Sequence, residues 1–131
     1  MLFRSMDKLK LGSGLIEKWL NKFEGSFVLS DKLDGTSGLL ILRNDCKHML
    51  FTRGDGKVGT DISSLLKNMN GIPDLKINLV VRGELLISKS IYEKNKNEYV
   101  NARAMINGLV GKKNISNDEV KNITFSGPKT L

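Results

Sequence analysis

The 131-residue sequence has one cysteine, two prolines and few aromatic side chains, which make up 6% of the residues. With Cys46 alone, the chain can form no disulfide within itself and cannot assemble a metal site from several thiolates. No apolar run approaches the roughly 18 residues that a membrane-spanning helix requires. The first residues also lack the apolar core of a signal peptide. We therefore expect an intracellular protein in a reducing compartment, with no membrane partner.

The composition is otherwise that of a folded protein with a basic surface. Hydrophobic residues make up 40% and charged residues 27%, which is enough apolar material for a core and argues against disorder. The 21 Lys and Arg against 14 Asp and Glu leave a net charge of +7. This excess favours a polyanionic partner, with nucleic acid as the first candidate. The alternative is a soluble surface that is merely basic.

The first half of the chain predicts one helix followed by strands. Ser13 or Gly14 can cap the helix, and Gly25 stands where a left-handed residue would end it. The apolar face of this helix is formed by Leu15, Ile16, Trp19, Leu20 and Phe23. The period then changes to that of strands, which we predict at residues 27–29, 39–42 and 49–51. Turn-forming residues at 44–46 predict a hairpin between the last two strands.

The second half predicts short helices around one further strand, at residues 77–81. Asp61 or Ser63 can begin a helix that ends near residues 70–71. Later helix starts are predicted by the capping pairs Ser90–Glu93 and Ser116–Glu119 and by Asn101. Without strict strand–helix alternation, this pattern predicts an α+β fold with mainly antiparallel sheets flanked by helices. Six aromatic residues are assigned to the core rather than to base stacking: Phe3, Trp19, Phe23, Phe27, Phe51 and Phe125.

The sharpest candidate site is Lys-Leu-Asp-Gly at residues 32–35, directly after the strand predicted at residues 27–29. Side chains two apart on a strand point to the same face, so Lys32 and Asp34 would project together. Gly35 allows a sharp turn or a close approach of the backbone to a ligand. A lysine held without its proton can act as a covalent nucleophile, although losing that proton at neutral pH costs about 4.6 kcal/mol. The alternative is an exposed lysine followed by an ordinary Asp-Gly turn.

A second candidate is the glycine-rich stretch at residues 52–61, Thr-Arg-Gly-Asp-Gly-Lys-Val-Gly-Thr-Asp. Its glycines fit the Gly-x-Gly-x-x-Gly spacing of a dinucleotide-binding turn. We reject that interpretation because the preceding strands predict an antiparallel hairpin and because Asp55 would bring a negative charge close to a pyrophosphate. A glycine-rich turn that presents Arg53 to a ligand is the simpler hypothesis, with a purely structural hairpin turn as the alternative.

Two more candidates carry charged side chains at the ends of predicted elements. Glu84 closes the sequence Val-Arg-Gly-Glu at a strand end, where its carboxylate could accept from ribose hydroxyls or hold a hard cation through water. Arg103 lies in the first turn of the helix capped by Asn101, where a forked donor adds to the anion preference of a helix N-terminus. Both patterns also fit solvated surface residues. His48, without His or Cys companions, is interpreted as structural.

Taken together, the order and spacing of these motifs resemble the adenylation domain of NAD-dependent DNA ligases. The resemblance rests on Lys-x-Asp-Gly at residues 32–35, Thr-Arg-Gly-Asp-Gly-x-x-Gly-x-Asp at 52–61, Arg-Gly-Glu at 82–84 and Asn-x-Arg at 101–103. It runs from about residue 5 to residue 113 and includes Ser-Met-Asp at residues 5–7, which is similar to the segment before that domain's core. Its most specific element is the Thr-Arg-Gly-Asp-Gly stretch.

The resemblance implies a role for each candidate residue. Lys32 would attack the adenylyl phosphorus of NAD and release nicotinamide mononucleotide, and Asp34 would support this catalytic step. Glu84 would contact the ribose, and Arg53 and Arg103 would engage nucleotide or nick phosphates. The nucleotide-binding set implied in this way is Asp31, Lys32, Gly35, Arg53, Glu84 and Arg103. Mg²⁺ is expected to offset charge on the phosphorus, and AMP would then pass to the 5′-phosphate of nicked double-stranded DNA.

The sequence departs from the family pattern in its nucleotide contacts. The family commonly has Glu two places before the lysine, for adenine recognition, whereas this chain has Ser30 followed by Asp31. Asn-Pro-Arg-Asn becomes Asn-Ala-Arg-Ala at residues 101–104. A later family arginine falls at Gly111, which two lysines follow. These departures concern nucleotide binding more than the covalent step.

The resemblance also sets the expected domain organisation. Residues 1–25 would form a helical lead-in, and residues 26–131 would form part of a nucleotidyltransferase domain with an ATP-grasp-like fold. The family's C-terminal lysine motifs and its other domains have no counterpart before Leu131. We therefore expect a fragment of a longer ligase or a truncated relative, incomplete for ligation by itself, with the remaining ligase domains as partners.

Three other functions stay open on the sequence. The first is the same covalent chemistry with ATP as the cofactor, on DNA or RNA ends. The second is a non-catalytic basic module that binds nucleic acid in a salt-dependent way. The third is an oxidoreductase built on the Gly-x-Gly-x-x-Gly turn, which requires a parallel sheet.

Overall fold

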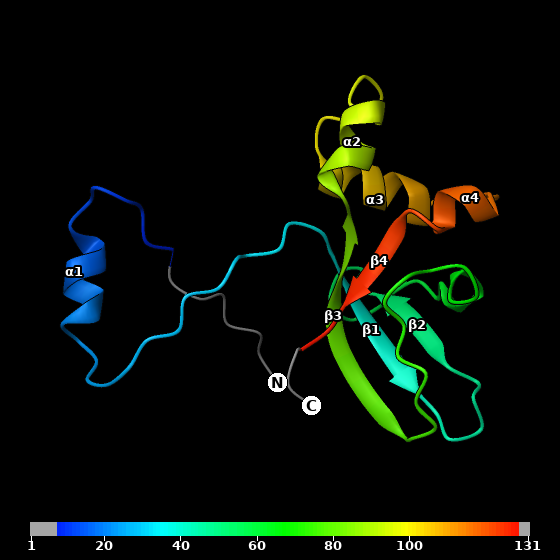
Figure 1. Ribbon diagram of the computed structural model, residues 1–131, viewed down its shortest axis with the longest axis horizontal. Helices are drawn as coiled ribbons and strands as arrows, with labels where there is room; N and C mark the ends of the chain where they lie inside the picture. The colour runs from blue at the N-terminus through cyan, green and yellow to red at the C-terminus, as the bar shows by residue number, and fades with distance from the viewer. Residues whose placement is uncertain (1–7, 129–131) are drawn as a thin grey trace. The chain divides into compact units, whose positions relative to one another are not determined.

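The structure is a computed structural model that describes residues 8–128 (Figure 1). Phe3 and the Ser-Met-Asp segment at residues 5–7 lie outside this range. The chain divides into two compact units between Asp31 and Lys32. Within the described range, none of the helices has the length and apolar character needed to span a bilayer.

Within residues 8–31 there is one short helix, α1 (Leu15–Leu20). It begins where predicted but ends before Phe23 and Gly25, so Gly25 is not its terminator. Its N-cap is Gly14, which has a φ of 68° and no side chain to accept a hydrogen bond. No residue of α1 is buried. Trp19 packs instead on two other aromatic rings, with centroid distances of 5.2 Å to Phe23 and 5.5 Å to Phe27. Both phenylalanines are 48% exposed, so their assignment to a core is wrong. Within residues 8–31 the six-residue helix has no second layer to pack against.

The strand predicted at residues 27–29 is also wrong. Residues 26–34 have no regular secondary structure, and Val28 and Leu29 are 94% and 99% exposed. A strand forms only where a neighbouring strand takes up its backbone hydrogen bonds, and a run of three β-prone residues does not supply that neighbour. Lys32 therefore follows an irregular segment, and no shared strand face places it beside Asp34.

The second unit is built on an antiparallel sheet with strand order β2-β1-β3-β4 (Figure 1). The strands are β1 (Thr36–Leu42), β2 (Met49–Thr52), β3 (Leu79–Ile87) and β4 (Ile123–Ser126). The predicted hairpin is confirmed, with Leu40 opposite Leu50. In its turn, Cys46 has a φ of 61°, and the Arg43 N–H donates to His48 Nδ1 at 3.0 Å. The antiparallel pairing confirms the α+β class, and no two strands within residues 8–128 pair in parallel as a dinucleotide-binding turn would require.

Strand β3 runs further than predicted. It continues through Arg-Gly-Glu to Ile87, so Glu84 lies in the middle of a strand and not at its end. Arg-Gly-Glu at residues 82–84 interrupts the apolar pattern, so the alternation of the strand was not recognised. That alternation buries Val81, Leu85 and Ile87 on one face. Gly83 belongs to the same alternation. A Cβ there would lie 2.5 Å from the ring of Phe125 on β4, a strand that the sequence did not predict.

Two of the predicted helix starts are confirmed. The Ala104 N–H donates to the Asn101 side chain at 2.7 Å, which caps α3 (Ala102–Val110). Ser116 and Glu119 form a reciprocal capping box at the start of α4 (Asn117–Val120). Both pairs satisfy backbone donors that a helix N-terminus leaves without partners.

The other two helix predictions need correction. The helix α2 (Lys89–Asn95) is capped by Ser88 and not by Ser90, because Ser88 has the extended backbone of an N-cap and its Oγ accepts from Ile91 N–H at 3.3 Å. The helix expected from Asp61 or Ser63 is only one 3₁₀ turn, η1 (Ser63–Leu65).

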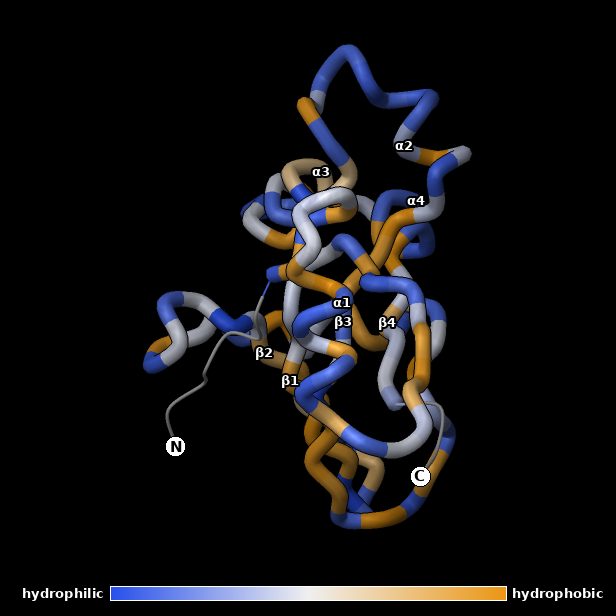
Figure 2. Tube along the Cα trace, turned by 90° about the vertical axis from the view of Figure 1, so that its left-hand side faces the viewer, coloured by the Kyte–Doolittle hydropathy of each residue, from blue (hydrophilic) through white to orange (hydrophobic). Residues whose placement is uncertain are grey.

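The core lies between the sheet and the helices of the second unit. Figure 2 shows apolar residues along β1 and hydrophilic ones around α2. Phe125 is buried as predicted, whereas Phe51 is half-buried. The core includes Leu40, Leu42, Leu50, Val81, Leu85, Ile87, Met105, Ile106, Leu109, Ile123 and Phe125. Helix α3 packs on β3 and thereby fixes its exposed face beside the sheet.

Candidate nucleotide-binding site

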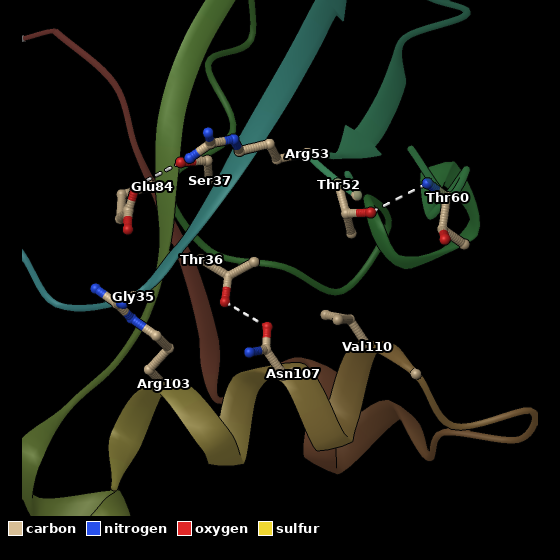
Figure 3. A pocket seen from close by; sticks show the side chains of 12 residues that line it. Gly35, Thr36, Ser37, Thr52, Arg53, Thr60, Glu84, Arg103, Asn107 and Val110 are labelled. Atoms are coloured by element: carbon tan, nitrogen blue, oxygen red, sulfur yellow. Dashed lines mark hydrogen bonds between the residues drawn. The ribbon is translucent and has the colours of Figure 1, made fainter. Parts of the chain in front are cut away.

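A pocket with a volume of about 580 Å³ opens between the sheet and α3 (Figure 3). It is lined by Gly35, Thr36, Ser37, Thr52, Arg53, Gly54, Thr60, Glu84, Arg103, Asn107, Val110 and Gly111. These residues come from the start of β1, the loop after β2, the middle of β3 and one face of α3. The volume falls within the roughly 300–1,000 Å³ that is usual for small-molecule sites.

The sheet register brings the first three of these segments together. Ser37 lies opposite Glu84, and Gly38 lies opposite Thr52 at the end of β2. Gly35 is buried just before β1, where a Cβ would collide with the carbonyl oxygen of Leu85. Only glycine therefore lets the chain enter β1 this close to β3.

The glycine-rich loop folds back on the end of β2. The Thr52 N–H donates to the carbonyl of Thr60 at 2.9 Å, and the Thr60 N–H donates to Thr52 Oγ1 at 3.0 Å. Gly54 has a φ of 55°, and a Cβ there would collide with the carbonyl of Val58. These contacts hold Arg53, the residue between β2 and the turn, at the rim of the pocket.

The two aspartates of this motif stabilise the loop and do not face the pocket. Asp55 Oδ1 accepts from the Val58 N–H at 2.7 Å and from the Lys57 N–H at 2.8 Å, and these bonds lower the pKa of its carboxyl group. Asp61 Oδ1 accepts from the hydroxyl of Ser63 at 2.5 Å and from its N–H at 2.9 Å, which lowers the pKa of Asp61. The negative charge of Asp55 is thus taken up within its own turn.

Arg103 projects from the first turn of α3. Its Nη2 lies 2.8 Å from Asp34 Oδ1, in an ion pair whose side chains are 53% and 68% exposed. Asn107, Val110 and Gly111 follow at four, seven and eight residues, so they share the helix face of Arg103. The opposite side of α3 supplies core residues.

Glu84 provides the acidic side of the pocket. Its half-buried carboxylate accepts from Ser37 Oγ at 3.4 Å, and the Ser37 carbonyl accepts from the Arg53 N–H at 3.2 Å. Figure 3 shows the Arg53 side chain extending toward Ser37 and Glu84, with Arg103 rising from α3 on the opposite side. Two guanidinium groups and one carboxylate suit a ligand that carries both phosphate and hydroxyl groups.

The structure brings most of the predicted site residues into one place. Gly35, Arg53, Glu84 and Arg103 line the same pocket, and Asp34 is joined to it through Arg103. Two predicted residues do not line it: Asp31 and Lys32, whose side chains are exposed.

Several lining residues were missed by the sequence prediction although signals for them existed. Thr36 and Ser37 directly follow Gly35 in the chain, so their closeness in sequence to a predicted site residue was the available signal. Asn107 stands four residues after Arg103 in a helix that the sequence had predicted. The signal was therefore the helical spacing and not the residue type.

Lys112, which directly follows Gly111, forms an ion pair with the capping glutamate of α4. Lys112 Nζ lies 2.5 Å from Glu119 Oε1. The hydrogen bond from Lys112, aided by the Ser116 backbone, lowers the pKa of Glu119 to about 2, while the pKa of Lys112 is raised. Lys112 is thus engaged at the α4 capping box.

Across residues 8–128, no group of three His, Cys, Asp or Glu side chains is arranged to hold a metal.

Comparisons with known proteins give a consistent result. The family model of the NAD-dependent DNA ligase adenylation domain matches residues 5–124. A DNA ligase of Acanthamoeba polyphaga mimivirus is 42% identical over 113 residues, covering 83% of this chain and 18% of the relative. DNA ligases of Borrelia hermsii (strain HS1 / DAH) and Borreliella burgdorferi (strain ZS7) are 35% and 33% identical, covering 82% and 93% of this chain. The chain spans about one fifth of the length of these relatives.

Proposed function

The chain belongs to the adenylation-domain family of NAD-dependent DNA ligases, and we propose that it binds the adenylate part of NAD and forms a covalent lysyl-AMP. Family membership confirms the resemblance that the sequence motifs indicated. The observation that carries the proposal is the convergence of Gly35, Arg53, Glu84 and Arg103 on one pocket from four separate motifs.

The pocket chemistry fits a nucleotide. Arg53 and Arg103 supply forked donors for phosphate oxygens, and the Glu84 carboxylate can accept from ribose hydroxyls. Gly35 lets the chain enter β1 close to β3, which places the start of β1 beside the pocket. The same groups would accept ATP, so we propose NAD as the donor on family membership and keep ATP as the alternative.

Lys32 is the proposed nucleophile. Its amine would form the P–N bond to the adenylyl phosphorus while the P–O bond breaks, and its electron pair would leave with nicotinamide mononucleotide. The amine proton must pass to an acceptor during this step. Lys32 lies three residues before Gly35, so its Cα is within about 10 Å of the pocket lining along the chain. Residues 26–34 lack regular structure, which leaves that approach unobstructed by a strand ladder.

Asp34 and Glu84 are the acidic residues available to this step. Asp34 is paired with Arg103 at 2.8 Å, and Glu84 is held by Ser37. Mg²⁺ is bound in many phosphoryl-transfer sites by one or two carboxylates together with substrate phosphates, so a single protein carboxylate such as Glu84 is compatible with it. When bound, the ion would neutralise charge that develops on the phosphorus.

The wider setting is proposed on the same basis. Nicked double-stranded DNA is the proposed acceptor of AMP, through its 5′-phosphate, and the net charge of +7 favours that polyanion. The remaining domains of a ligase are the proposed partners of the chain, since it spans about one fifth of its relatives. The exposed free thiol of Cys46 is compatible with a reducing, intracellular location.

A chimaeric ligase tests the proposal directly. The matching segment of the mimivirus DNA ligase is replaced by this chain and incubated with NAD labelled in its adenylyl phosphate or with labelled ATP. We expect a label from NAD that survives a denaturing gel, and nick sealing. Lys32→Ala should abolish both, whereas Lys57→Ala, in the exposed part of the glycine-rich loop, should change neither.

The outcomes separate the alternatives. A label that persists in Lys32→Ala would overturn the assigned nucleophile, and a label from ATP alone would replace NAD as the donor. A folded chimaera that binds DNA in a salt-dependent way but takes no label would favour the non-catalytic module.

A further inference from the structure

One hydrogen bond ties the two sides of the pocket together. The Thr36 hydroxyl donates to Asn107 Oδ1 at 2.6 Å, between the first residue of β1 and the middle of α3. Both residues line the pocket, and Figure 3 shows their side chains pointing toward each other from β1 and α3. Neither residue belongs to the motifs by which the sequence resembled its family.

In the structure, this bond uses the oxygen end of the Asn107 amide. A side-chain amide has one oxygen acceptor and one NH₂ group with two donors. Because the oxygen accepts from Thr36, the nitrogen is turned away from β1, and Figure 3 shows it on the side of Arg103. Among residues 8–128, the Asn107 side chain makes only the hydrogen bond through Oδ1. Because Asn107 lines the pocket, its two N–H donors are available to a ligand there.

The neighbouring groups indicate an anionic ligand for these donors. Arg103 stands one helical turn before Asn107, on the same face of α3. An oxyanion already lies against its guanidinium, because Asp34 Oδ1 is 2.8 Å away. That pair is more than half exposed, and exposed pairs contribute little, so a phosphate can displace the carboxylate. The carboxylate of Glu84, by contrast, is engaged by Ser37.

We propose that Asn107 donates its side-chain amide to a phosphate group held beside Arg103, and that Thr36 is a positioning residue that fixes the amide with its nitrogen toward the ligand. The proposal rests on the proposed nucleotide-binding function and adds a phosphate contact to it. The phosphate is that of the bound adenylate or the 5′-phosphate of the DNA end, since both present the same oxygens to the same donors.

The test titrates the 131-residue chain with AMP and, as a probe without phosphate, with adenosine. Losing one hydrogen bond to a charged acceptor corresponds to about tenfold weaker binding. We expect Asn107→Ala to weaken AMP binding by about that factor and to leave adenosine binding unchanged. Asn107→Asp keeps the acceptor for Thr36 but replaces the donor by a negative charge, so it should weaken AMP binding at least as much.

The positioning role of Thr36 has its own pair of variants. Thr36→Val removes the hydroxyl but keeps the shape, and it should weaken AMP binding several-fold because the amide is no longer held. Thr36→Ser keeps the hydroxyl and should restore binding close to that of the unchanged chain. Thermal melting of each variant confirms that it is folded before its affinity is compared.

DNA probes distinguish the two sources of the phosphate. A nicked duplex with a 5′-phosphate and one with a 5′-hydroxyl are compared for the unchanged chain and for Asn107→Ala. A larger loss on the phosphorylated nick assigns the contact to the DNA end, whereas a loss confined to AMP assigns it to the adenylate.

Other results would overturn either the role of Asn107 or the proposed function itself. If Asn107→Asp binds AMP as the unchanged chain does, the amide only ties α3 to β1 and the proposal is overturned. If Asn107→Ala loses AMP affinity and adenosine affinity equally, Asn107 does not contact the phosphate. If the unchanged chain binds neither AMP nor NAD, the proposed function fails, which is a different outcome from normal AMP binding in the Asn107 variants.

Discussion

The two units of the chain differ in how they use apolar residues. Residues 32–128 bury a continuous core between an antiparallel sheet and its helices, and their exposed helix face forms one wall of the pocket. Among residues 8–31, no side chain is fully buried. Trp19 contacts Phe23 and Phe27, but the three side chains remain half-buried or exposed. The same residue types thus give a core only where a second layer is present to cover them.

This difference matters for the site because the proposed nucleophile stands at the boundary between the units. The groups proposed to bind phosphate and ribose are fixed by strand register and by helix spacing in the second unit. Lys32 is the first residue of that unit and follows a segment without regular structure. Binding and covalent chemistry are therefore expected to respond differently to substitution.

The largest contrast is expected from matched leucine truncations in the two units. Leu40→Ala removes a fully buried side chain from β1 and should lower the free energy of unfolding by about 3 kcal/mol. Leu29→Ala, at a side chain that is 99% exposed, should change it by less than about 0.5 kcal/mol. Urea denaturation measures both. Equal destabilisation by the two variants would show that residues 26–31 are packed and that the contrast is wrong.

A second contrast lies within the glycine-rich loop. Gly54→Ala combines a φ of 55° with a collision at the Val58 carbonyl, so we expect a loss of about 2 kcal/mol in stability and weaker AMP binding. Gly56→Ala also has a positive φ, of 90°, but its Cβ would meet open space, and its cost should be smaller. Urea denaturation and an AMP titration of both variants provide the comparison. A Gly56 variant as damaging as Gly54 would show that backbone conformation alone, and not the close approach, holds Arg53 in place.

A gain in AMP affinity is expected from adding a side chain at Gly111, where the pocket wall has none. Gly111 lines the pocket with a φ of −83°, and the sequence resemblance places a family arginine at this position. A Cβ there would lie 3.0 Å from the Asn107 carbonyl oxygen, a close contact that both variants below share. Gly111→Arg adds a forked donor and should tighten AMP binding several-fold. Gly111→Ala is the matched control without charge and should leave AMP affinity unchanged in a calorimetric titration. Equal affinities for the two variants would show that the phosphate does not reach this end of α3.

The smallest effect is expected from the capping box of α4. The pKa of Glu119 is lowered from its usual value near 4.5 to about 2 by Lys112, with help from Ser116. A carboxyl group with a lowered pKa contributes stability that is present above pH 4.5 and is lost as the pH falls toward 2. Because the side chains of the Lys112–Glu119 pair are 40% and 34% exposed, that contribution should be slight.

Glu119→Gln checks this pH dependence. The variant keeps the capping hydrogen bonds but loses the charge, so its urea midpoint should lie slightly below that of the unchanged chain at pH 7. The two midpoints should converge as the pH approaches 2. A gap that is constant with pH would exclude the carboxylate as its source.

The sequence predicted the parts of the fold that depend on local chemistry. The caps at Asn101 and Ser116 and the hairpin around residues 44–46 follow from side chains that satisfy nearby backbone groups, and the structure confirms them. The strand at residues 27–29 failed because a strand also depends on a distant partner. The central position of Glu84 was missed because its polar neighbours interrupted the apolar alternation of β3.

The residues of the candidate site were also predictable only where they belong to a local sequence motif. Motif spacing identified Gly35, Arg53, Glu84 and Arg103, and the structure brings them to one pocket. Asn107 was missed although its helical spacing from Arg103 pointed to it, whereas its hydrogen bond from Thr36 joins residues 71 positions apart and could not be read from local spacing. The role of Lys32 remains a prediction, since its side chain is exposed and outside the lining.

The most direct test of the central claim is a heteronuclear NMR titration of the chain with AMP. If residues from four motifs form one nucleotide-binding pocket, the largest shifts of backbone amides will occur at Gly35, Arg53, Glu84 and Arg103. Amides of α1 and of residues 26–29 will stay unchanged. Shifts that are centred on the aromatic cluster of the first unit, or that are absent at saturating AMP, would contradict it.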